Sequence, residues 1–320
     1  MDKQQAPLIV RPLSEFLTHD YPPVEHVVKP WFNKRGIAMV AAWRGTGKTY
    51  FGLSLAYAIA TGGKFLGFEV PEPRRVLYVD GEMDPAEVKA ILSHTHHAAE
   101  VDGNGDPTLA ATNLRILTHA DQDFGIPDLS DPENDTGRKQ VEAALAEADV
   151  LILDNLSTLC HSGVENDAES WGTMQQWLVS LRRADKTSLI VHHTGKPKGK
   201  NGRGDQRGTS RREDVLNASI VLFKRLEEWG RFKVEFTKTR GFKAPEEFVV
   251  LIQHDKEAGV CRLVREPQDI ADKIAELLGQ GRTQKAIAKE LSLSEPTVSR
   301  IVNSKIRPRE ETQEAGQTVH

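Results

Sequence analysis

The sequence predicts an α/β protein with a mostly parallel central sheet flanked by helices, followed by a small all-helical domain. Two observations carry this prediction. Between about residues 36 and 250, apolar runs of strand length alternate with longer helical patterns. After about Glu266 the strand-like runs stop, and three short helical patterns follow in close succession.

The individual elements follow from the same periodicity. The apolar runs expected to form strands are residues 37–42, 76–79, 114–117, 150–153, 189–192, 220–223, 232–236 and 248–252. The helical patterns between them cover residues 49–60, 85–97, 138–147 and 170–183. The later strands are expected to extend the sheet as hairpin-like additions. The C-terminal helices are expected over residues 269–278, 283–291 and 294–303.

These elements predict five segments. A proline-rich, extended lead-in is expected over residues 1–30 and the main α/β domain over residues 31–255. A linker over residues 256–268 then leads to the helical domain, residues 269–306, and to a flexible tail, residues 307–320.

The composition excludes several classes of protein. Charged residues make up 28% of the 320 residues and hydrophobic ones 38%, as in folded, soluble proteins. The 42 basic and 46 acidic side chains give a net charge of −4, so the chain is not a basic coat for nucleic acid. No apolar run approaches the ~20 residues of a membrane span, and two cysteines make no disulfide framework. Without a secretory signal at its start, the chain is expected to be cytoplasmic and to make no membrane contact.

The strongest motif is a glycine-rich turn, Ala-Trp-Arg-Gly-Thr-Gly-Lys-Thr over residues 42–49, between an apolar strand and an apolar helix. Glycines let the backbone curl so that its N–H groups converge on phosphate oxygens, and the positive end of the helix adds to the attraction. We therefore expect ATP to bind here. Lys48 would reach the outer phosphates and the Thr49 hydroxyl would ligate Mg²⁺. The loop itself consists of Arg44, Gly45, Thr46 and Gly47, and Ala42 stands where this type of loop usually has a glycine.

Two further acidic strand ends suit the same chemistry. Asp154 ends the run Val-Leu-Ile-Leu-Asp and is expected to hold the Mg²⁺ ion. Asp80 and Glu82 follow another apolar strand, and a carboxylate there can orient the attacking water and accept its proton. Both are candidates for that role, and Glu82 is the favoured one.

These motifs together resemble the RecA-like P-loop ATPases, and among them the plasmid RepA-type hexameric replicative helicases and their AAA-like relatives. The resemblance covers roughly residues 20–250 and includes the loop at 42–49, the strand ends at 77–83 and 151–159, and Ile-Val-His-His-Thr at 190–194. It implies a RecA-like fold for the main domain. In this family a glutamate after the second strand is catalytic, which matches Glu82. A polar residue that ends a later strand senses the terminal phosphate, and His193, beside His192, matches it best.

The resemblance also implies a partner. Members of this family form rings in which ATP lies between neighbours, and a basic residue of one subunit completes the site of the next. The sequence Thr-Lys-Thr-Arg-Gly at 237–241 resembles the Lys-x-Arg strand of bacterial replicative helicases. It therefore implies Arg240 as the residue that stabilises transition-state charge in a neighbour, with Lys238 also contacting the nucleotide. Arg207 and Arg211 are alternatives, and the hexameric ring rests on the resemblance alone.

A glycine-rich, basic loop follows the strand that ends at His193. Its cationic side chains include Lys196, Lys198, Lys200, Arg203, Arg207 and Arg211. A mobile, positively charged loop can follow a phosphate backbone without reading bases, and RecA-like proteins place DNA-binding loops at this point. We expect it to bind single-stranded DNA, the alternative being a merely solvated loop.

The C-terminal patterns resemble a helix-turn-helix of bacterial regulators. The resemblance implies that Thr297, Ser299 and Arg300 project towards double-stranded DNA. A small protein-interaction module is the alternative.

The sequence thus predicts a Mg²⁺-dependent ATPase that acts as a ring-forming DNA helicase or translocase in plasmid or phage replication. An ATP-switched DNA-binding regulator or replication-initiation factor, and a RadA-like recombination ATPase, stay open as alternatives.

Overall fold

The computed structural model describes residues 8–161, 168–194, 214–224, 230–255, 260–266, 270–291, 293 and 295–306. The largest unit within these ranges is a nine-stranded sheet. Its spatial order is β13 (Val260–Arg265), β12 (Phe248–Asp255), β11 (Arg231–Thr239), β10 (Ala218–Lys224), β3 (Ile37–Ala42), β9 (Thr187–His193), β8 (Val150–Asp154), β6 (Val76–Asp80) and β7 (Leu114–Thr118). The strands from β10 to β7 are parallel, and β11 to β13 are antiparallel additions. The predicted α/β class is confirmed.

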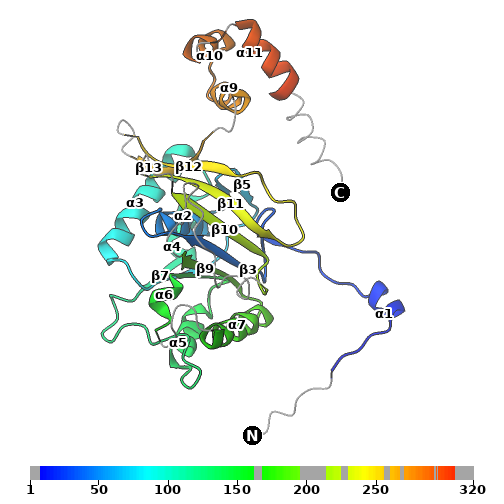
Figure 1. The fold of residues 1–320 in the computed structure, drawn as a ribbon, viewed down its shortest axis with the longest axis vertical. Helices are drawn as coiled ribbons and strands as arrows, with labels where there is room; N and C mark the ends of the chain where they lie inside the picture. The colour runs from blue at the N-terminus through cyan, green and yellow to red at the C-terminus, as the bar shows by residue number, and fades with distance from the viewer. Residues whose placement is uncertain are drawn as a thin grey trace.

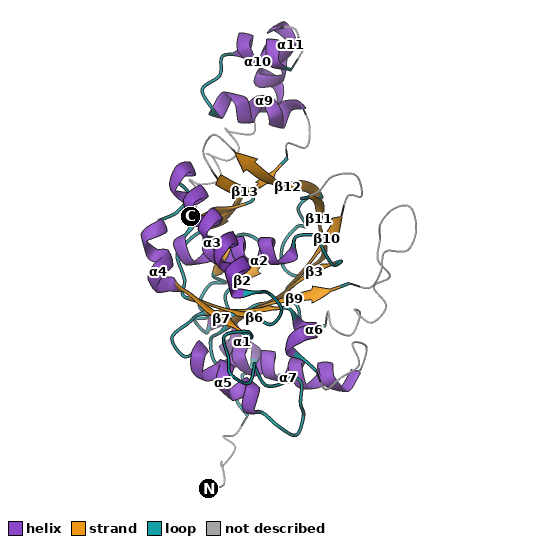
Figure 2. Cartoon of the chain, turned by 90° about the vertical axis from the view of Figure 1, so that its left-hand side faces the viewer, coloured by secondary structure: helices purple, strands orange, loops and turns teal. Residues whose placement is uncertain are grey.

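Helices cover both faces of this sheet (Figure 1, Figure 2). One face carries α2 (Lys48–Thr61), α3 (Pro85–Asp102) and α4 (Ala110–Asn113), and the other carries α5 (Thr136–Leu145), α6 (Leu156–Leu159) and α7 (Ala168–Arg183). Successive side chains of a strand point to opposite faces. Accordingly, Ala38 and Val40 of β3 pack in the core beneath α2, whereas Ile37 and Met39 pack in the core beneath α5 and α7.

The parallel strands give the sheet two distinct edges. The carboxyl edge is where β3, β6, β8 and β9 end, and the amino edge is where they begin. In sheets of this kind ligands bind at the carboxyl edge. Strand β11 runs the other way, because Thr239 near its end pairs with Ala218 at the start of β10. The end of β11 therefore lies at the amino edge.

Every strand and helix expected in the main domain is present, with ends that differ by a few residues. The elements that periodicity did not predict are mostly too short to show a pattern. They are α1 (Leu13–Thr18), the paired strands β1 (His26–Val28) and β2 (Phe32–Asn33), the paired strands β4 (Gly63–Phe65) and β5 (Phe68–Val70), the 3₁₀ turn η1 (Pro107–Leu109), the short helices α4 and α6, and the edge strand β13.

Two of the segments expected outside the main domain contain strands that pack in it or pair with it. The lead-in over residues 1–30 contains β1, whose Val27 and Val28 are fully buried in the same core as α2. The linker over residues 256–268 contains β13, which pairs with β12 and buries Val260 and Cys261. Both strands belong to the main domain because they bury apolar side chains in it.

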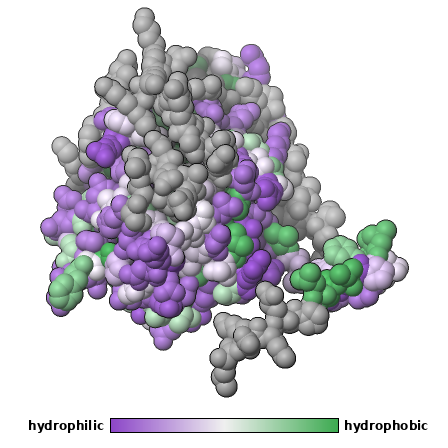
Figure 3. Space-filling view, turned by 60° about the horizontal axis from the view of Figure 1, so that its bottom comes forward, coloured by the Kyte–Doolittle hydropathy of each residue, from purple (hydrophilic) through white to green (hydrophobic). Residues whose placement is uncertain are grey.

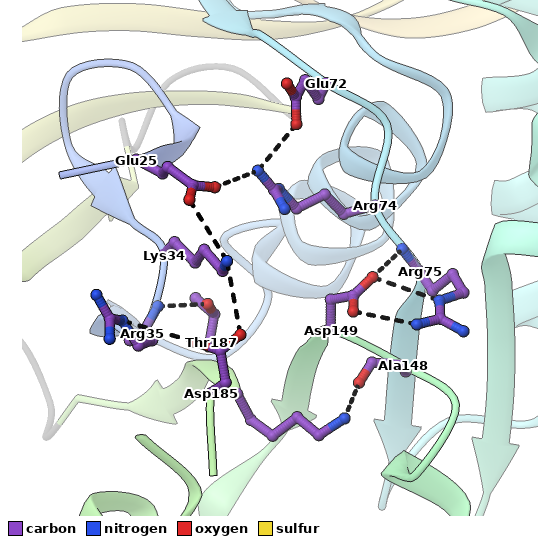
Figure 4. A network of polar contacts seen from close by, with 11 residues as sticks. Glu25, Lys34, Arg35, Glu72, Arg74, Arg75, Ala148, Asp149, Asp185 and Thr187 are labelled. Atoms are coloured by element: carbon purple, nitrogen blue, oxygen red, sulfur yellow. Dashed lines mark hydrogen bonds and ion pairs between the residues drawn. The ribbon is translucent and has the colours of Figure 1, made fainter. Parts of the chain in front are cut away.

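A network of ion pairs lies along the amino edge (Figure 4). Arg74 lies 3.1 Å from the carboxylates of both Glu25 and Glu72. Lys34 lies 3.5 Å from those of Glu25 and Asp185. Such ion pairs near the surface each contribute up to about 1 kcal/mol to the free energy of unfolding. Together they join the segment before β1 to the turns that precede β3, β6 and β9.

An N-terminal arm, residues 8–24, extends away from the main domain (Figure 1). Helix α1 within it has no buried residue. The arm exposes most of the large hydrophobic side chains that are exposed among the described residues, and Figure 3 shows the apolar surface of this projection. They are Leu8, Ile9, Val10, Leu13, Phe16, Leu17, Tyr21 and Val24.

The C-terminal helices α9 (Ile270–Gly279), α10 (Gln284–Glu290) and α11 (Glu295–Ile301), with the π-helical turn η2 (Val302–Ile306), form a separate unit (Figure 1). Their core contains Ile287, Ala288 and Val298, and it shares no residue with the cores of the main domain. The Thr283 hydroxyl caps α10 by accepting a hydrogen bond from the Ala286 amide.

Candidate active site

The glycine-rich loop joins β3 to α2. Gly45 and Gly47 have φ angles of 70° and 104°, in the left-handed region that favours glycine. A Cβ atom on Gly47 would lie 3.4 Å from Phe232 and 3.5 Å from Ile252, which is ordinary van der Waals contact, so the backbone conformation and not the available space favours glycine here. Gly47 is the N-cap of α2 and offers no side-chain acceptor to the first-turn N–H groups. Such N–H groups form a ready site for phosphate.

Ala42 explains how the loop tolerates the loss of the usual first glycine. It is the last residue of β3 and is buried. Among the non-glycine residues that the structure describes, positive φ angles occur at Arg35, Leu66 and Asp185, and so not at Ala42. The turn that requires glycine therefore begins after this position.

Three side chains converge on the carboxylate of Glu82 at the carboxyl edge. Lys48 Nζ, at the start of α2, lies 3.5 Å from Glu82 Oε2. His193 Nε2, at the end of β9, lies 3.4 Å from the same oxygen. The Asn155 side-chain amide, directly after β8, donates a hydrogen bond to it as well. Three of the predicted residues, Lys48, Glu82 and His193, are thus brought together.

The charges around Glu82 fix its protonation state. Partial burial raises the pKa of Glu82, but Lys48 and His193 oppose this effect and leave the pKa below its ordinary value. Burial, followed by the charge of Lys48, lowers the pKa of His193. At neutral pH the site therefore pairs an ionised glutamate with a charged lysine and a neutral histidine.

The two acids that compete for the base role have different surroundings. Asp80 is buried, and its Oδ1 accepts hydrogen bonds from the backbone N–H groups of Glu82 and Met83, at 3.1 and 2.7 Å. Burial, followed by the neighbouring charge of Asp154, raises the pKa of Asp80 to about 6. Asp80 thus shapes the turn that carries Glu82, whereas the Glu82 carboxylate faces Lys48.

Asp154 lies at the end of β8, paired in register with Asp80 at the end of β6. The Tyr78 hydroxyl donates a 2.7 Å hydrogen bond to Asp154 Oδ2. Burial, followed by the charge of Asp154, raises the pKa of Tyr78, which keeps the hydroxyl protonated. A Cβ atom on Gly52 of α2 would lie 3.0 Å from this hydroxyl. The carboxylate is therefore held beneath the helix that begins with Lys48 and Thr49.

The oxygen atoms at this edge fit a magnesium ion. Asp154 Oδ1 and Asp80 Oδ2 are buried and have no hydrogen-bond partner in the described part of the chain. Mg²⁺ prefers oxygen ligands and is usually held by one or two carboxylates together with substrate phosphates. Thr49, buried in the first turn of α2, supplies the hydroxyl that such loops provide.

The geometry distinguishes the two histidines at the end of β9. His193 pairs in register with Ala42, and His192 pairs with Ala41. Ala42 belongs to the core beneath α2, so His193 lies on the face of the phosphate loop and His192 on the opposite face. Of the two, His193 is the one that reaches Glu82.

Sequence reasoning missed Asn155. It is fully buried, and its Oδ1 accepts a hydrogen bond from the Thr158 amide while its side-chain amide contacts Glu82. An asparagine that follows a strand and precedes a short helical turn is a typical N-cap signal. Only the fold reveals that the same side chain reaches the end of β6.

Two other cations lie near the loop. Arg44, a predicted loop residue, is exposed. Lys224, at the end of β10 and not predicted, lies with its Nζ 4.0 Å from where a Cβ on Gly45 would be. Both side chains are positioned to add positive charge beside a bound polyphosphate.

Arg240 and Lys238 lie at the other edge of the sheet. Lys238 pairs in register with Ser219 near the start of β10, and Arg240 directly follows β11. The six residues of β3 separate this level from the phosphate loop, roughly 17 Å at about 3.3 Å per residue. The structure therefore does not bring Arg240 to the phosphate loop of its own chain.

The predicted DNA contacts divide into two groups. Lys196, Lys198, Lys200, Arg203, Arg207 and Arg211 lie outside the described residues. Thr297 and Ser299 on α11 are partly exposed and Arg300 is exposed. No helix in the described part of the chain is long and apolar enough to span a membrane.

One comparison with known proteins finds a match. The model of a family described as the AAA domain matches residues 7–199, well over half of the chain. The matched range contains the phosphate loop, Glu82, Asp154, Asn155 and His193. No curated protein matches the sequence.

Proposed function

Because this chain belongs to the AAA domain family, which indicates an ATPase of the P-loop type, we propose that it hydrolyses ATP with Mg²⁺ and works as a ring-forming DNA helicase or translocase in plasmid or phage replication. One observation carries the ATPase assignment. Lys48, Asn155 and His193 converge on Glu82 beside the phosphate loop. A lysine for phosphate, a base for water and a polar sensor are the parts that phosphoryl transfer requires.

The contact between Lys48 and Glu82 indicates an exchange of partners on binding. A triphosphate carries more negative charge than one carboxylate and offers several acceptors, so it competes successfully for the lysine. Once Lys48 turns to the phosphates, Glu82 is held by Asn155 and His193 and is free to accept a proton from water. Asp154 and Thr49 would hold the magnesium ion, which neutralises phosphate charge when bound.

His193 is suited to report the state of the nucleotide. It ends β9, and the next residue, Thr194, donates its backbone N–H to Ala42 O at 3.0 Å. The basic loop at residues 196–212 begins directly after it. Loss of the terminal phosphate would change the partners of His193 and, through two intervening residues, the start of the basic loop. This supports a coupling of hydrolysis to movement on single-stranded DNA.

Two features support a homo-oligomer. The N-terminal arm exposes eight large hydrophobic side chains, and exposed apolar surfaces of this kind mark interaction sites. Arg240 lies at the amino edge, so it can assist hydrolysis only in another copy. A head-to-tail contact between the two edges is heterologous and closes into a ring when the rotation permits.

The C-terminal unit favours a second candidate. Its three helices build a core of their own, and α11 exposes Arg300 beside Thr297 and Ser299. A helix-turn-helix that binds duplex DNA would suit an ATP-switched regulator or replication-initiation factor that does not unwind. In the helicase, the same unit would bind the ring to its duplex.

Strand displacement on a forked DNA substrate distinguishes these candidates. The helicase separates the strands with ATP, and Lys48→Ala abolishes the separation. Tight duplex binding and ATP hydrolysis without any separation would instead identify the regulator. If the wild-type protein hydrolyses no ATP, with or without DNA, both candidate functions are refuted.

A further inference from the structure

Two arginines share one short segment at the amino edge. Arg182, in the last turn of α7, donates through Nη2 to Val215 O at 2.9 Å and to Asn217 Oδ1 at 3.1 Å. Arg240, directly after β11, donates through Nη2 to Asp214 O at 3.0 Å and through its backbone N–H to Asn217 O at 2.9 Å. Since the two guanidinium groups bind the carbonyls of consecutive residues, they lie near each other.

Neither guanidinium has an acidic partner among the residues that the structure describes. In the described part of the chain, Arg182 and Arg240 form no ion pair, although other arginines at this edge, such as Arg74 and Arg75, do. Two like charges held close together repel each other unless an anion lies between them. Burial, followed by the charge of Arg240, lowers the pKa of Arg182, which agrees with an unbalanced pair.

The contacts above leave N–H donors of both guanidinium groups unused. A guanidinium carries five N–H donors, and the contacts above use only Nη2 on each side chain. Arg182 Nε is buried and has no hydrogen-bond partner among the described residues. Arginine forks of this kind suit phosphate oxygens, which accept two parallel hydrogen bonds from one guanidinium.

We propose that Arg182 and Arg240 together form a phosphate-binding site, and that its ligand is the terminal phosphate of a nucleotide held by a neighbouring copy of the chain. This inference rests on the proposed ring ATPase and adds Arg182, on a different element from Arg240, to the residues that act on the neighbour. The site lies at the edge opposite to its own phosphate loop. DNA is a second source of phosphate, because the segment from Asp214 to Asn217 directly follows the basic loop.

The first experiment measures DNA-free ATP hydrolysis by the full-length Arg182→Gln chain. We expect kcat to fall at least about tenfold, while the affinity for a fluorescent ADP analogue stays within about twofold, because the chain's own loop is intact. Arg183→Gln is the matched control. Arg183 is the next residue of α7, is exposed, and loses the same charge. A kcat for Arg182→Gln equal to that of Arg183→Gln would overturn the inference.

Mixing variants tests whether the site serves another copy. Lys48→Ala retains both arginines but has lost its phosphate lysine, and Arg182→Gln retains the lysine. A mixture of the two should recover activity that neither has alone. A mixture of Arg182→Gln with Arg240→Gln should recover none, because every interface then lacks one arginine. Failure of the first mixture to recover activity would contradict action on a neighbour.

A third measurement does not depend on hydrolysis. Tripolyphosphate should raise the melting temperature of Lys48→Ala, whose own loop is disabled, with an apparent dissociation constant that Arg182→Gln raises at least about fivefold and Arg183→Gln leaves unchanged. An equal effect of both substitutions would mean that no built phosphate site exists. Arg182→Lys keeps the charge and should restore part of the tripolyphosphate affinity. This variant controls for the possibility that Arg182→Gln acts through a folding defect.

These experiments have outcomes that distinguish a failure of the proposed ATPase function from a failure of the Arg182–Arg240 phosphate site. Wild-type protein without ATPase activity would refute the proposed function, and the tripolyphosphate titration would still decide the inference. Wild-type activity that falls with Arg240→Gln and not with Arg182→Gln would refute only the inference. If Arg182→Gln weakens binding of a DNA oligonucleotide and leaves DNA-free hydrolysis intact, the phosphate is that of DNA and the neighbour's nucleotide is excluded.

Discussion

The two edges of one sheet differ in how their charges are balanced. At the carboxyl edge, Lys48 faces Glu82, and Tyr78 donates to Asp154, so these charged groups have partners within the chain. At the amino edge, Arg182 and Arg240 lie side by side on backbone carbonyls, and the described part of the chain gives neither of them an acidic partner. A single chain therefore holds a nearly complete site at one edge and an unbalanced pair of cations at the other.

In the proposed ring, this difference indicates which parts a neighbouring copy would supply. A bound triphosphate would bring excess negative charge to the carboxyl edge, beyond what Lys48 neutralises. The Arg182–Arg240 pair at the amino edge of a neighbour would bring positive charge to it. Complementary edges of one molecule favour a head-to-tail assembly.

The largest effect is expected for Lys48→Ala, which removes the cation of the carboxyl edge. Nucleotide affinity should fall at least about a hundredfold and ATP hydrolysis should become undetectable, since a charge-assisted contact to phosphate is lost. Titration with a fluorescent nucleotide and a phosphate-release assay measure the two quantities. Lys89→Ala, an exposed lysine on α3, is the control and should leave both unchanged.

Arg240→Gln tests the amino edge alone. We expect kcat to fall on the order of a thousandfold, as for other arginines that act in trans, while nucleotide affinity is retained. Lys243→Gln removes a nearby exposed cation and should have little effect. Hydrolysis at different protein concentrations checks the result. If the rate per chain does not depend on protein concentration and Arg240→Gln is as active as wild type, Arg240 does not act on the nucleotide of a neighbouring copy.

Glu82→Gln separates binding from chemistry at the carboxyl edge. The amide cannot accept the proton from water, so kcat should fall on the order of a hundredfold. ATP should bind at least as well, because a negative charge near the phosphates is gone. Glu87→Gln, on exposed surface of α3, provides the control. Full activity of Glu82→Gln would assign the base role to another group.

Tyr78→Phe tests whether the buried hydroxyl supports Asp154. Removing it leaves a buried carboxylate oxygen without its donor, which should cost on the order of 1–3 kcal/mol of unfolding free energy. Chemical denaturation measures this loss. Tyr50→Phe removes a hydroxyl that donates to the uncharged Cys261 backbone carbonyl, and its cost in unfolding free energy should be smaller.

Asp80→Asn gives the smallest effect and a defined pH dependence. The pKa of Asp80 is raised from 3.8 to about 6, so its contribution to stability is present below pH 3.8 and is lost as the pH rises through about 6. Without magnesium or nucleotide, Asp80→Asn should therefore be more stable than wild type above pH 6, on the order of 1–2 kcal/mol, and the advantage should vanish near pH 4. Melting curves across this range provide the measurement, and an advantage that grows towards low pH would contradict the sign.

The sequence predicted the parts of the molecule that follow a period or a motif. Long apolar runs such as residues 37–42 and 150–153 became strands because burial on both faces needs such runs. The phosphate loop was predictable because glycine and lysine at fixed spacing follow from backbone geometry. Strands β1 and β13 were missed, since their apolar residues are too few to show a period and are buried by tertiary packing.

The candidate site was predictable only in part for a similar reason. Lys48, Glu82 and His193 each follow or begin a regular element, so their positions at the carboxyl edge follow from topology. The contact of Asn155 with Glu82 depends on which strands are neighbours, and the sequence does not contain the order β9-β8-β6. The closeness of Arg182 and Arg240 depends on the path of the segment from Asp214 to Asn217 and has no signal in either local sequence.

Calorimetric titration of the full-length protein with a slowly hydrolysed ATP analogue and Mg²⁺ tests whether Lys48 and its loop bind the nucleotide. We expect saturable binding at the phosphate loop of each chain for wild type and Glu82→Gln, and none for Lys48→Ala. An equal heat of binding for wild type and Lys48→Ala, or no binding by wild type, would contradict this expectation.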